Sequence, residues 1–464
     1  MAVLPIAARN PIVQTCFTTD PAPMVHGDTL YVYTGHDENG ADFFWMQEWR
    51  VYSTTDMVNW TDHGTPLAIE DFEWADDRAW APQCVERNGK FYFYVPLHSK
   101  LTGAMAIGVA VGDTPVGPFH DAVGAPLADG SWDFIDPTCY IDDDGQAWLY
   151  WGNPQIYYAK LNPDMISFDG EVRTVNPDAK GFGEGKEVPM EPGKHYASSY
   201  TEGPWFFKRD GLYYMLYAAG GIPESIAYST SKRPDGPWTY RGIIMPQNDW
   251  TNSFTNHCGV TDFKGKSYFF YHTGRLPQGG GFGRSVAVEE FKYNPDGTFP
   301  TIHPTEEGVK PISTFNPYGR HEAETMAWSQ GVTTRQCDAV GVYLSDIHNG
   351  DYIMLSNVDF STPAATTPAP NSGASATSSA VRIPKTFGAK VASGLRGGTI
   401  ELRLDSLEGP LLATLEVPAT GGWESWRDIQ TEITTPTSGI HDLYLIFKGR
   451  EGPELFNFDH WTLN

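Results

Sequence analysis

A five-fold repeat is the feature of this sequence that most restricts its fold. In each copy, a glycine in a turn is followed three or four positions later by an aromatic residue within an apolar stretch. The copies are Gly27…Tyr31, Gly89…Tyr92, Gly145…Trp148, Gly211…Tyr214 and Gly265…Tyr268, and successive glycines lie 62, 56, 66 and 54 residues apart. Units of this length that combine hairpin turns with several short strands are typical of β-propeller blades.

Each repeat is predicted to contain four strands. Third strands are expected at 49–53, 106–110, 155–159, 225–229 and 285–289. The composition agrees, because aromatic residues make up 14% of the chain and charged residues only 19%, with 48 Gly and 35 Pro available for turns. We therefore predict an all-β chain in which residues 1–315 form a five-bladed β-propeller.

One side chain recurs at an equivalent position in every repeat. Counting back seven to nine positions from each turn glycine gives Asp20, Trp80, Asp136, Glu202 and His257. These positions are expected on the strand that lines the propeller axis, so the five side chains should converge at one mouth of the channel. Three acids in ordinary strands would be costly unless paired. The pattern therefore favours a functional cluster over a structural ion network.

Two carboxylates on opposite sides of a pocket suit glycoside hydrolysis, and in inverting enzymes they stand about 6.5–9.5 Å apart with a water between them. We assign Asp20 as the general base and Glu202 as the general acid. Asp136 would orient these groups and raise the pKa of Glu202 by like-charge repulsion. Both aspartates precede a proline, so a turn-capping role is the structural alternative.

The motifs around these residues resemble those of glycoside hydrolase family 43. The matching segments are Asp20-Pro-Ala-Pro, Trp80-Ala-Pro-Gln, Ile135-Asp-Pro-Thr, Thr201-Glu-Gly-Pro and Gly283-Arg-Ser-Val. The resemblance covers about the first 300 residues and implies an inverting enzyme on a five-bladed propeller, with the three carboxylates in the roles given above. It also implies that Trp80 helps to form the sugar pocket and that Arg284 contacts the sugar or Asp136.

A calcium ion on the propeller axis is a further implication of the resemblance. His257 would help to hold it, largely through waters, and His272 is the alternative. No organic cofactor is expected.

Within the family, the chain is most similar to the arabinoxylan arabinofuranohydrolases, through the segments 33–38 and 60–64. This likeness implies an exo-acting, non-reducing-end α-L-arabinofuranosidase that removes side groups from arabinoxylan. Aromatic residues could then form the floor of a groove for substrate, with burial in the core as the alternative for each: Phe43, Phe44, Trp45, Trp74 and Trp151. A β-xylosidase, an endo-arabinanase and a non-catalytic glycan-binding propeller remain as alternative functions.

A second domain is expected at residues 316–464. Strict alternation at 398–406 predicts a half-buried strand, and the segments around it resemble carbohydrate-binding module family 6, a β-sandwich (jelly roll). The resemblance implies a structural calcium site at Glu322, Glu324 and Asp459, and a sugar cleft at Tyr343, Trp423 and Asn457. A sandwich that only braces the propeller is the alternative. The Ser/Thr/Pro-rich stretch at about 361–380 is interpreted as an insertion within this domain.

The net charge of the chain restricts the kinds of partner that the protein can bind. A net charge of −25 disfavours nucleic acid and anionic membrane, and it suits a neutral polysaccharide such as arabinoxylan. No run of about 18 apolar residues is present to span a membrane. We expect a secreted, extracellular protein that is a monomer and whose signal peptide is not part of this sequence. The five cysteines are widely spaced, so up to two disulfides or five free thiols are both compatible with the pattern.

Overall fold

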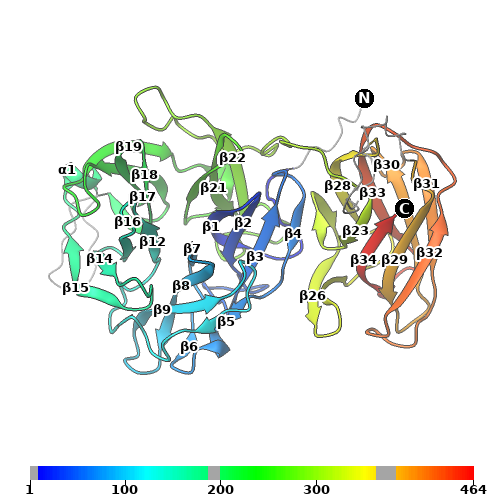
Figure 1. Cartoon of the computed structure of the whole chain (residues 1–464), viewed down its shortest axis with the longest axis horizontal. Coiled ribbons are helices and arrows are strands. Elements are labelled where there is room, and N and C mark those ends of the chain that lie inside the picture. Colours follow the sequence, from blue (N-terminus) through cyan, green and yellow to red (C-terminus); the bar gives the residue numbers. More distant parts are fainter. Residues whose placement is uncertain (1–8, 186–198, 362–382) are drawn as a thin grey trace, which may run out of the picture. The chain divides into compact units, whose positions relative to one another are not determined.

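The computed structural model describes residues 9–185, 199–361 and 383–464, and it is built almost entirely of strands (Figure 1). The chain divides into two compact units. The N-terminal unit comprises Cys16–Ser53 and Thr65–Gly308, and the C-terminal unit comprises Met1–Thr15, Thr54–Gly64 and Val309–Asn464. The insertion expected at about 361–380 lies, beyond residue 361, outside the described residues.

Five sheets make up the described part of the N-terminal unit. The first contains β1 (Thr19–His26), β2 (Thr29–Gly35), β3 (Glu48–Thr54) and β5 (Leu67–Ala68). The second contains β6 (Ala75–Asp77), β7 (Gln83–Arg87), β8 (Lys90–Ser99), β9 (Met105–Gly112), β10 (His120–Asp121) and β11 (Ala128–Asp129). The third contains β12 (Thr138–Ile141), β13 (Ala147–Trp151), β14 (Ile156–Leu161) and β15 (Phe168–Val175).

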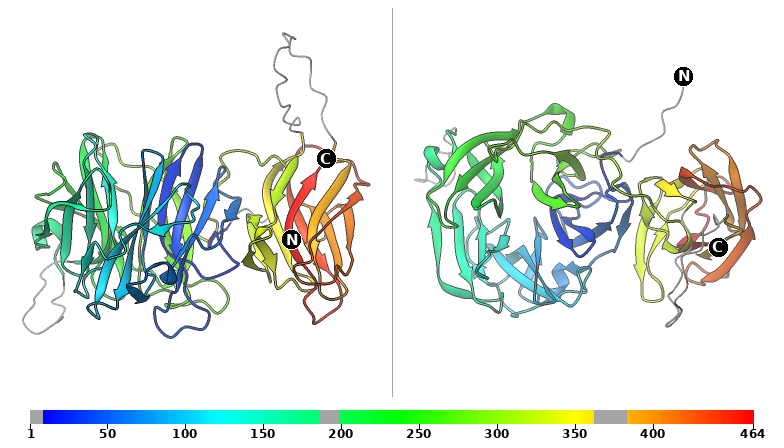
Figure 2. Two further views of the ribbon diagram at one scale, coloured as in Figure 1. Left: turned by 60° about the horizontal axis from the view of Figure 1, so that its bottom comes forward. Right: turned by 45° about the horizontal axis from the view of Figure 1, so that its top comes forward.

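The fourth sheet contains β16 (Tyr200–Arg209), β17 (Leu212–Ala219), β18 (Ser225–Ser231) and β19 (Thr239–Met245). The fifth contains β20 (Gly259–Phe263), β21 (Lys266–Thr273) and β22 (Ser285–Phe291). Short helices lie at η1 (Ile69–Asp71), α1 (Ala179–Phe182) and η2 (Asp249–Thr251). The right-hand view of Figure 2 shows the sheets of this unit following one another around a common centre.

The five repeat glycines lie in hairpin turns, as predicted. Each turn joins two antiparallel strands: β1 to β2, β7 to β8, β12 to β13, β16 to β17 and β20 to β21. All five glycines have positive φ, between 61° and 85°. Tight hairpin turns need this left-handed backbone, and glycine adopts it without a steric penalty.

Two details of the repeat differ from the prediction. Four strands in order are present in the third and fourth sheets, but the fifth has three among the described residues. The segment after β22 contains Pro295, Pro300 and Pro304, which lack the N–H needed to extend a sheet. In addition, only Asp20 and Glu202 of the five equivalent residues lie on a strand. The other three lie just before the first strand of their hairpin.

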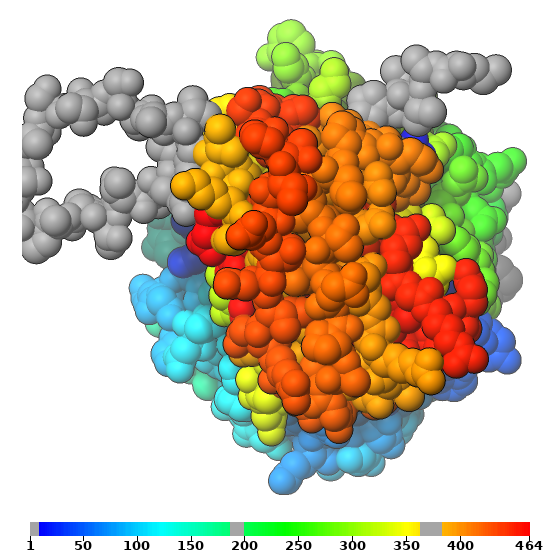
Figure 3. Space-filling view, turned by 90° about the vertical axis from the view of Figure 1, so that its right-hand side faces the viewer, coloured from blue at the N-terminus to red at the C-terminus, as the bar shows by residue number. Residues whose placement is uncertain are grey.

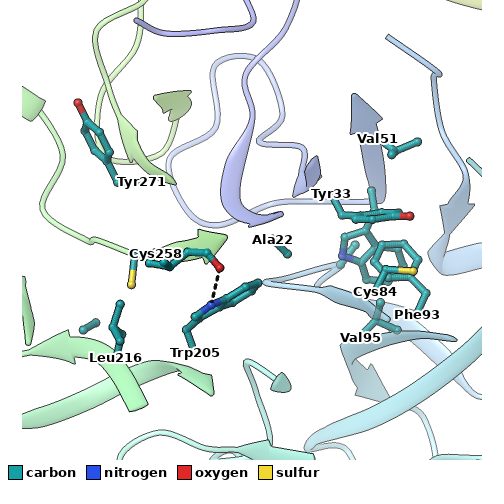
Figure 4. Packing of buried hydrophobic residues seen from close by; sticks show 14 of the residues in the cluster. Ala22, Tyr33, Val51, Cys84, Phe93, Val95, Trp205, Leu216, Cys258 and Tyr271 are labelled. Atoms are coloured by element: carbon teal, nitrogen blue, oxygen red, sulfur yellow. Dashed lines mark hydrogen bonds between the residues drawn. The ribbon is translucent and has the colours of Figure 1, made fainter. Parts of the chain in front are cut away.

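Large aromatic side chains fill the interior of the N-terminal unit. One buried cluster draws on β1, β2, β3, β7, β8, β16, β17 and β20 to β22. Figure 4 shows part of this cluster, in which the Trp205 indole donates to the Val260 carbonyl at 3.2 Å. Alternate strand residues from successive sheets therefore pack against one another, and the loops before the strands are left free to form a site.

The C-terminal unit contains two antiparallel sheets. One contains β26 (Thr333–Cys337), β27 (Gly341–Ser345), β34 (Asn457–Leu463), β29 (Thr386–Ala392) and β32 (Arg427–Glu432), with β23 (Gly319–Glu322) paired to β34. The other contains β25 (Trp328–Gln330), β28 (Tyr352–Asp359), β33 (Ile440–Lys448), β30 (Gly398–Leu404) and β31 (Leu411–Val417). The orange and red segments of this unit form most of the face seen in Figure 3.

The core of the C-terminal unit is aliphatic and aromatic and draws on both of its sheets. The alternation noted at 398–406 appears as β30, in which Ile400 and Leu402 are fully buried. In the same unit, β24 (Thr325–Met326) pairs with β4 (Trp60–Asp62).

All five cysteines are free thiols: Cys16, Cys84, Cys139, Cys258 and Cys337. No helix within the described ranges has the length and apolar character needed to cross a membrane.

Candidate active site

One cavity of about 240 Å³ lies in the N-terminal unit. Its wall includes one residue from each repeat, namely Asp20, Trp80, Asp136, Glu202 and His257. His272 and Arg284 also line it. The five residues from the repeats, which are up to 237 positions apart in the sequence, therefore meet at one place, because each lies at or just before the start of the hairpin of its own repeat.

The backbone turns sharply at two of the carboxylates. Asp20 has φ of 51° and Asp136 has φ of 57°, and each precedes a proline. Aspartate is one of the few residues that tolerates this left-handed region, and such strained residues often occur at functional sites. In β1, the pairing with β2 shifts register between Thr19 and Ala22, which releases Asp20 from the regular alternation.

Asp20 faces two basic side chains. Arg284 Nη1 and His272 Nδ1 lie 3.4 Å and 3.3 Å from Asp20 Oδ1. Burial by itself would raise the pKa of Asp20, but the Arg284 charge and the His272 hydrogen bond hold that pKa well below its ordinary value. Asp20 is therefore ionised at neutral pH, as a general base must be.

Arg284 is in turn held by Asp37. The Asp37 carboxylate accepts hydrogen bonds from Arg284 N, Nε and Nη2, each at 2.9 Å. Both side chains are almost completely buried. Burial opposes the Arg284 charge, but Asp20 and Asp37 outweigh it and raise the pKa of Arg284. This geometry fixes the guanidinium beside Asp20.

Glu202 is aimed into the cavity by irregular pairing. The register between β16 and β17 shifts on both sides of Glu202, the signature of bulges that redirect a side chain. Asn153 donates a hydrogen bond from Nδ2 to Glu202 Oε2. The next residue, Gly203, has φ of 61° and donates its N–H to Asp136 Oδ2 at 2.9 Å. A Cβ on Gly203 would lie 2.9 Å from His257 Nδ1, so only glycine fits there.

Burial and like charges raise the pKa of both remaining carboxyl groups. Burial and then the Asp20 charge raise the pKa of Glu202, against the opposing effects of Arg284 and Asn153. Burial, Glu202 and Asp20 raise the pKa of Asp136 well above its ordinary value. We expected Asp136 to be the charge that acts on Glu202. In the structure that charge is Asp20, because Asp136 is itself driven toward the neutral form.

The two histidines have different surroundings. His272 Nε2 donates to the Thr255 carbonyl at 2.9 Å, which leaves Nδ1 facing Asp20. Burial lowers the pKa of His257 to about 4, so its imidazole is neutral, the form that ligates metals. No group of three His, Cys, Asp or Glu side chains among the described residues surrounds a common point. His257 can therefore supply one ligand, and the axial calcium stays a prediction.

Aromatic side chains form the rim of the cavity. Phe43, Phe44 and Trp80 line it, and Trp80 Nε1 donates to the Phe44 carbonyl at 2.9 Å. The guanidinium of Arg284 lies 4.9 Å from the centre of the Phe44 ring. Trp45 is 40% exposed beside them.

Two tryptophans expected in a groove are buried instead. Trp151 has no exposed surface, because its ring stacks on those of Tyr157 and Phe168. Trp74 packs against Phe72. The substrate-binding prediction is wrong for Trp151, because its side chain points into the sheet interface of the third repeat rather than to the cavity.

Comparisons with known proteins identify the family of this chain. The family model described as glycosyl hydrolases family 43 matches residues 8–299. The chain belongs to glycosyl hydrolase family 43. The model of carbohydrate binding module family 6 matches residues 382–464.

Several relatives of this family 43 chain resemble it over nearly its whole length. It is 33% identical to an arabinoxylan arabinofuranohydrolase of Bacillus subtilis, over 98% of this chain and 92% of the relative. It is 33% identical to another from Paenibacillus polymyxa, over 97% and 74%. A crystal structure of a Bacillus subtilis family 43 arabinoxylan arabinofuranohydrolase with cellotetraose superposes with a TM-score of 0.81 at 30% identity, covering 99% of both chains.

The acids predicted to bind calcium in the family 6 module lie near one another. Burial raises the pKa of Glu324 well above its ordinary value, and Glu322, Asp62 and Asp459 add to the shift. Glu324 Oε2 and Asp459 Oδ1 are buried oxygens without a hydrogen-bond partner in the described part of the chain. Buried carboxylate oxygens of this kind suit a hard cation such as Ca²⁺. No group of three such side chains among the described residues surrounds a common point, however, so the calcium site of this unit stays a prediction.

The predicted sugar cleft of the module is more closed than expected. Tyr343 is only 5% exposed, because its ring meets Trp426 edge-on at 5.1 Å. Asn457 is buried and donates from Nδ2 to the Trp423 carbonyl at 2.7 Å. Asn457 therefore braces the loop that carries Trp423, and sugar binding by these three residues stays a prediction.

Several residues of the site were not found from the sequence. Asp37 lies next to His36 in a polar segment, and nothing local shows that its partner is Arg284. Asn153 and Glu224 likewise reach Glu202 only through the tertiary structure. The Asn153-Pro154 pair after β13 marks a turn, but it carries no signal for contact with an acid.

Proposed function

We propose that this protein is an inverting, exo-acting α-L-arabinofuranosidase that removes arabinofuranosyl side groups from arabinoxylan. One observation carries the proposal. A single cavity contains a carboxylate held ionised by Arg284, Asp20, and a carboxyl group held toward its protonated form, Glu202. Such a divided pair of carboxyl groups is what acid–base cleavage of a glycosidic bond needs.

The reaction follows from these charge states. Asp20 accepts a proton from a water molecule as that water attacks the anomeric carbon. Glu202 gives its proton to the glycosidic oxygen, which departs with the electron pair of the broken C–O bond. Asp136, whose carboxyl group is fixed by the Gly203 N–H, orients the sugar between Asp20 and Glu202. Because water attacks directly from the face opposite the leaving group, the anomeric configuration inverts.

The substrate class is supported by the cavity and by the relatives. A volume of about 240 Å³ is below the about 300–1,000 Å³ usual for drug-sized ligands, so it suits one sugar unit at a time. Beside it, Arg78 lies between two tryptophan rings, 5.6 Å from Trp80 in the cavity wall and 5.2 Å from Trp132. Trp132 is 52% exposed. This row offers a flat surface for the xylan backbone next to the pocket.

The finer features of the architecture belong to the same proposal. Five successive sheets with one cavity residue each support a five-bladed propeller over residues 1–315, and two packed antiparallel sheets support a jelly-roll sandwich over 316–464. Calcium at Glu322, Glu324 and Asp459 would tie strands of the sandwich together. An extracellular location suits an enzyme that acts on a polymeric substrate, and we propose that the enzyme acts there as a monomer.

Proton NMR of wheat arabinoxylan during digestion tests the proposal. Arabinose anomeric signals should disappear while the backbone signals persist, and the first anomer released should have inverted configuration. The variants Asp20→Asn and Glu202→Gln should lose about 10²–10⁴-fold in kcat with folding intact. Release of xylose or shortening of the chain would indicate β-xylosidase or endo-acting activity instead. No change would point to a glycan-binding protein.

A further inference from the structure

A fourth carboxyl group lies beside the acid and has no part in the reaction as described so far. Glu224 precedes β18 and is only 3% exposed. Its backbone N–H donates to the Phe254 carbonyl at 3.0 Å, and its Oε2 accepts from the Asn256 N–H at 2.8 Å. The segment before β20 thus holds both the backbone and one carboxyl oxygen of Glu224.

The second oxygen of Glu224 has an unusual environment. Oε1 is buried, and no donor among the described residues reaches it. The Glu224 and Glu202 carboxyl groups lie close enough to share a hydrogen bond when one of them carries a proton. Once Glu202 has given up its proton, two buried carboxylates would be in contact and would repel each other, and neither could donate. A proton that stays on Glu224 removes both problems, because the group can then donate to the Glu202 carboxylate.

We propose that Glu224 stays protonated and donates a hydrogen bond to Glu202, so that it stabilises the charge that forms on Glu202 when the acid gives up its proton. This inference rests on the function proposed above. Asn153 already donates to Glu202 Oε2. Glu202 would then become a carboxylate between two fixed donors, an interaction that is stronger in the transition state than in the ground state.

The proton balance is simple. The O–H bond of Glu202 breaks and its proton passes to the glycosidic oxygen, while the Glu224 proton remains on Glu224. Burial and the neighbouring Glu202 raise the pKa of Glu224 well above its ordinary value, consistent with a neutral donor. Glu224 is thus a positioning residue that acts through Glu202.

The other charged and titratable groups around the pair lie on or just before five other strands. They are Asp20 of β1, Asp136 before β12, His257 before β20, His272 of β21 and Arg284 before β22. Asp20 raises the pKa of Glu202 and Arg284 lowers it. A change at Glu224 alone leaves these effects in place, so its influence on Glu202 can be isolated.

Two substitutions separate a neutral donor from an ionised group. Glu224→Met removes the donor, so kcat on wheat arabinoxylan should fall about tenfold to a hundredfold. The alkaline limb of the pH profile should move to higher pH, because ionised Glu202 loses a partner. The loss should be much smaller on 4-nitrophenyl α-L-arabinofuranoside, whose leaving group needs little protonation. Glu224→Gln keeps both an acceptor for Asn256 and a donor for Glu202, so it should restore activity relative to Glu224→Met.

The alkaline limb of Glu224→Gln decides the matter even if Glu224→Met does not fold. An ionised Glu224 would be raising the pKa of Glu202 by repulsion, and its removal in Glu224→Gln would then move the limb to lower pH. That shift, or an equal loss on both substrates in Glu224→Met, would overturn the inference. Digestion by the wild-type enzyme distinguishes a failure of the Glu224 inference from a failure of the proposed function. If the wild-type enzyme releases xylose, the proposed specificity fails, and the Glu224 variants are then compared by their release of xylose.

Discussion

Replacing Asp37 by asparagine removes the negative charge that holds Arg284 in place. The carboxylate accepts three hydrogen bonds from Arg284 at 2.9 Å, and the side chains are 1% and 4% exposed. Loss of one partner of a buried ion pair costs about 3–5 kcal/mol. Arg284 keeps Asp20 as a second partner at 3.4 Å, so we expect the lower end, about 3 kcal/mol.

This loss should be visible in both stability and catalysis. At about 2–4 °C per kcal/mol for a domain of this size, Tm should fall by roughly 6–12 °C. The freed guanidinium should turn toward Asp20 and weaken the base, so kcat should fall as well. Calorimetry and arabinose release from arabinoxylan measure the two effects.

Asp28→Asn is the matched control, since it makes the same charge change at a side chain that is 82% exposed. It should leave Tm and kcat unchanged. If Asp37→Asn lowered Tm no more than Asp28→Asn does, the buried ion pair would not be what holds Arg284 in place. Asp20 would then lack the fixed positive charge that keeps its carboxylate ionised.

Three further results are expected. The pKa values of Asp136 and Glu224 are raised, so the folded protein keeps protons that the unfolded chain loses above about pH 4. The free energy of unfolding should therefore fall as pH rises from about 5 to about 8. A Tm that rose over this range would contradict this expectation. Millimolar Ca²⁺ should raise Tm, because an ion at a hundredfold excess over its Kd adds about 2.7 kcal/mol to the free energy of unfolding. Glu324→Gln should abolish this rise in Tm, and an equal rise in the variant would exclude this site. Trp132→Ala should raise KM for arabinoxylan but not for 4-nitrophenyl α-L-arabinofuranoside, and an equal change on both would rule out a backbone platform at Trp132.

Local sequence signals were sufficient for the repeat and for much of the site. Turn glycines followed by alternating apolar residues specify hairpins through short-range backbone geometry, and the pairings around Gly27 to Gly265 follow that pattern. Once the repeat is recognised, equivalence between copies brings Asp20, Glu202 and their counterparts to one cavity. Because the repeat relates distant positions to one another, local patterns were enough to predict which distant residues meet.

The same signals could not separate aromatic residues that look alike. Trp80 and Trp151 both lie near the ends of strands, but Trp80 lines the cavity whereas Trp151 stacks inside a sheet interface. In the C-terminal unit, Tyr343 is covered by Trp426 from a segment more than 80 residues away in the sequence. Which face an aromatic ring presents to solvent depends on neighbours that the local pattern does not contain.

The sequence by itself therefore determined which chemical groups occupy the equivalent positions of the repeat, because strand and turn preferences act over a few residues. Only the tertiary structure decided their charge states. Asp20 is ionised because Arg284, 264 positions away, lies beside it, and Glu202 and Glu224 share a buried site that favours protons. Burial and electrostatic interaction act through space, so the division of one base from its neighbouring acids is a property of the folded chain.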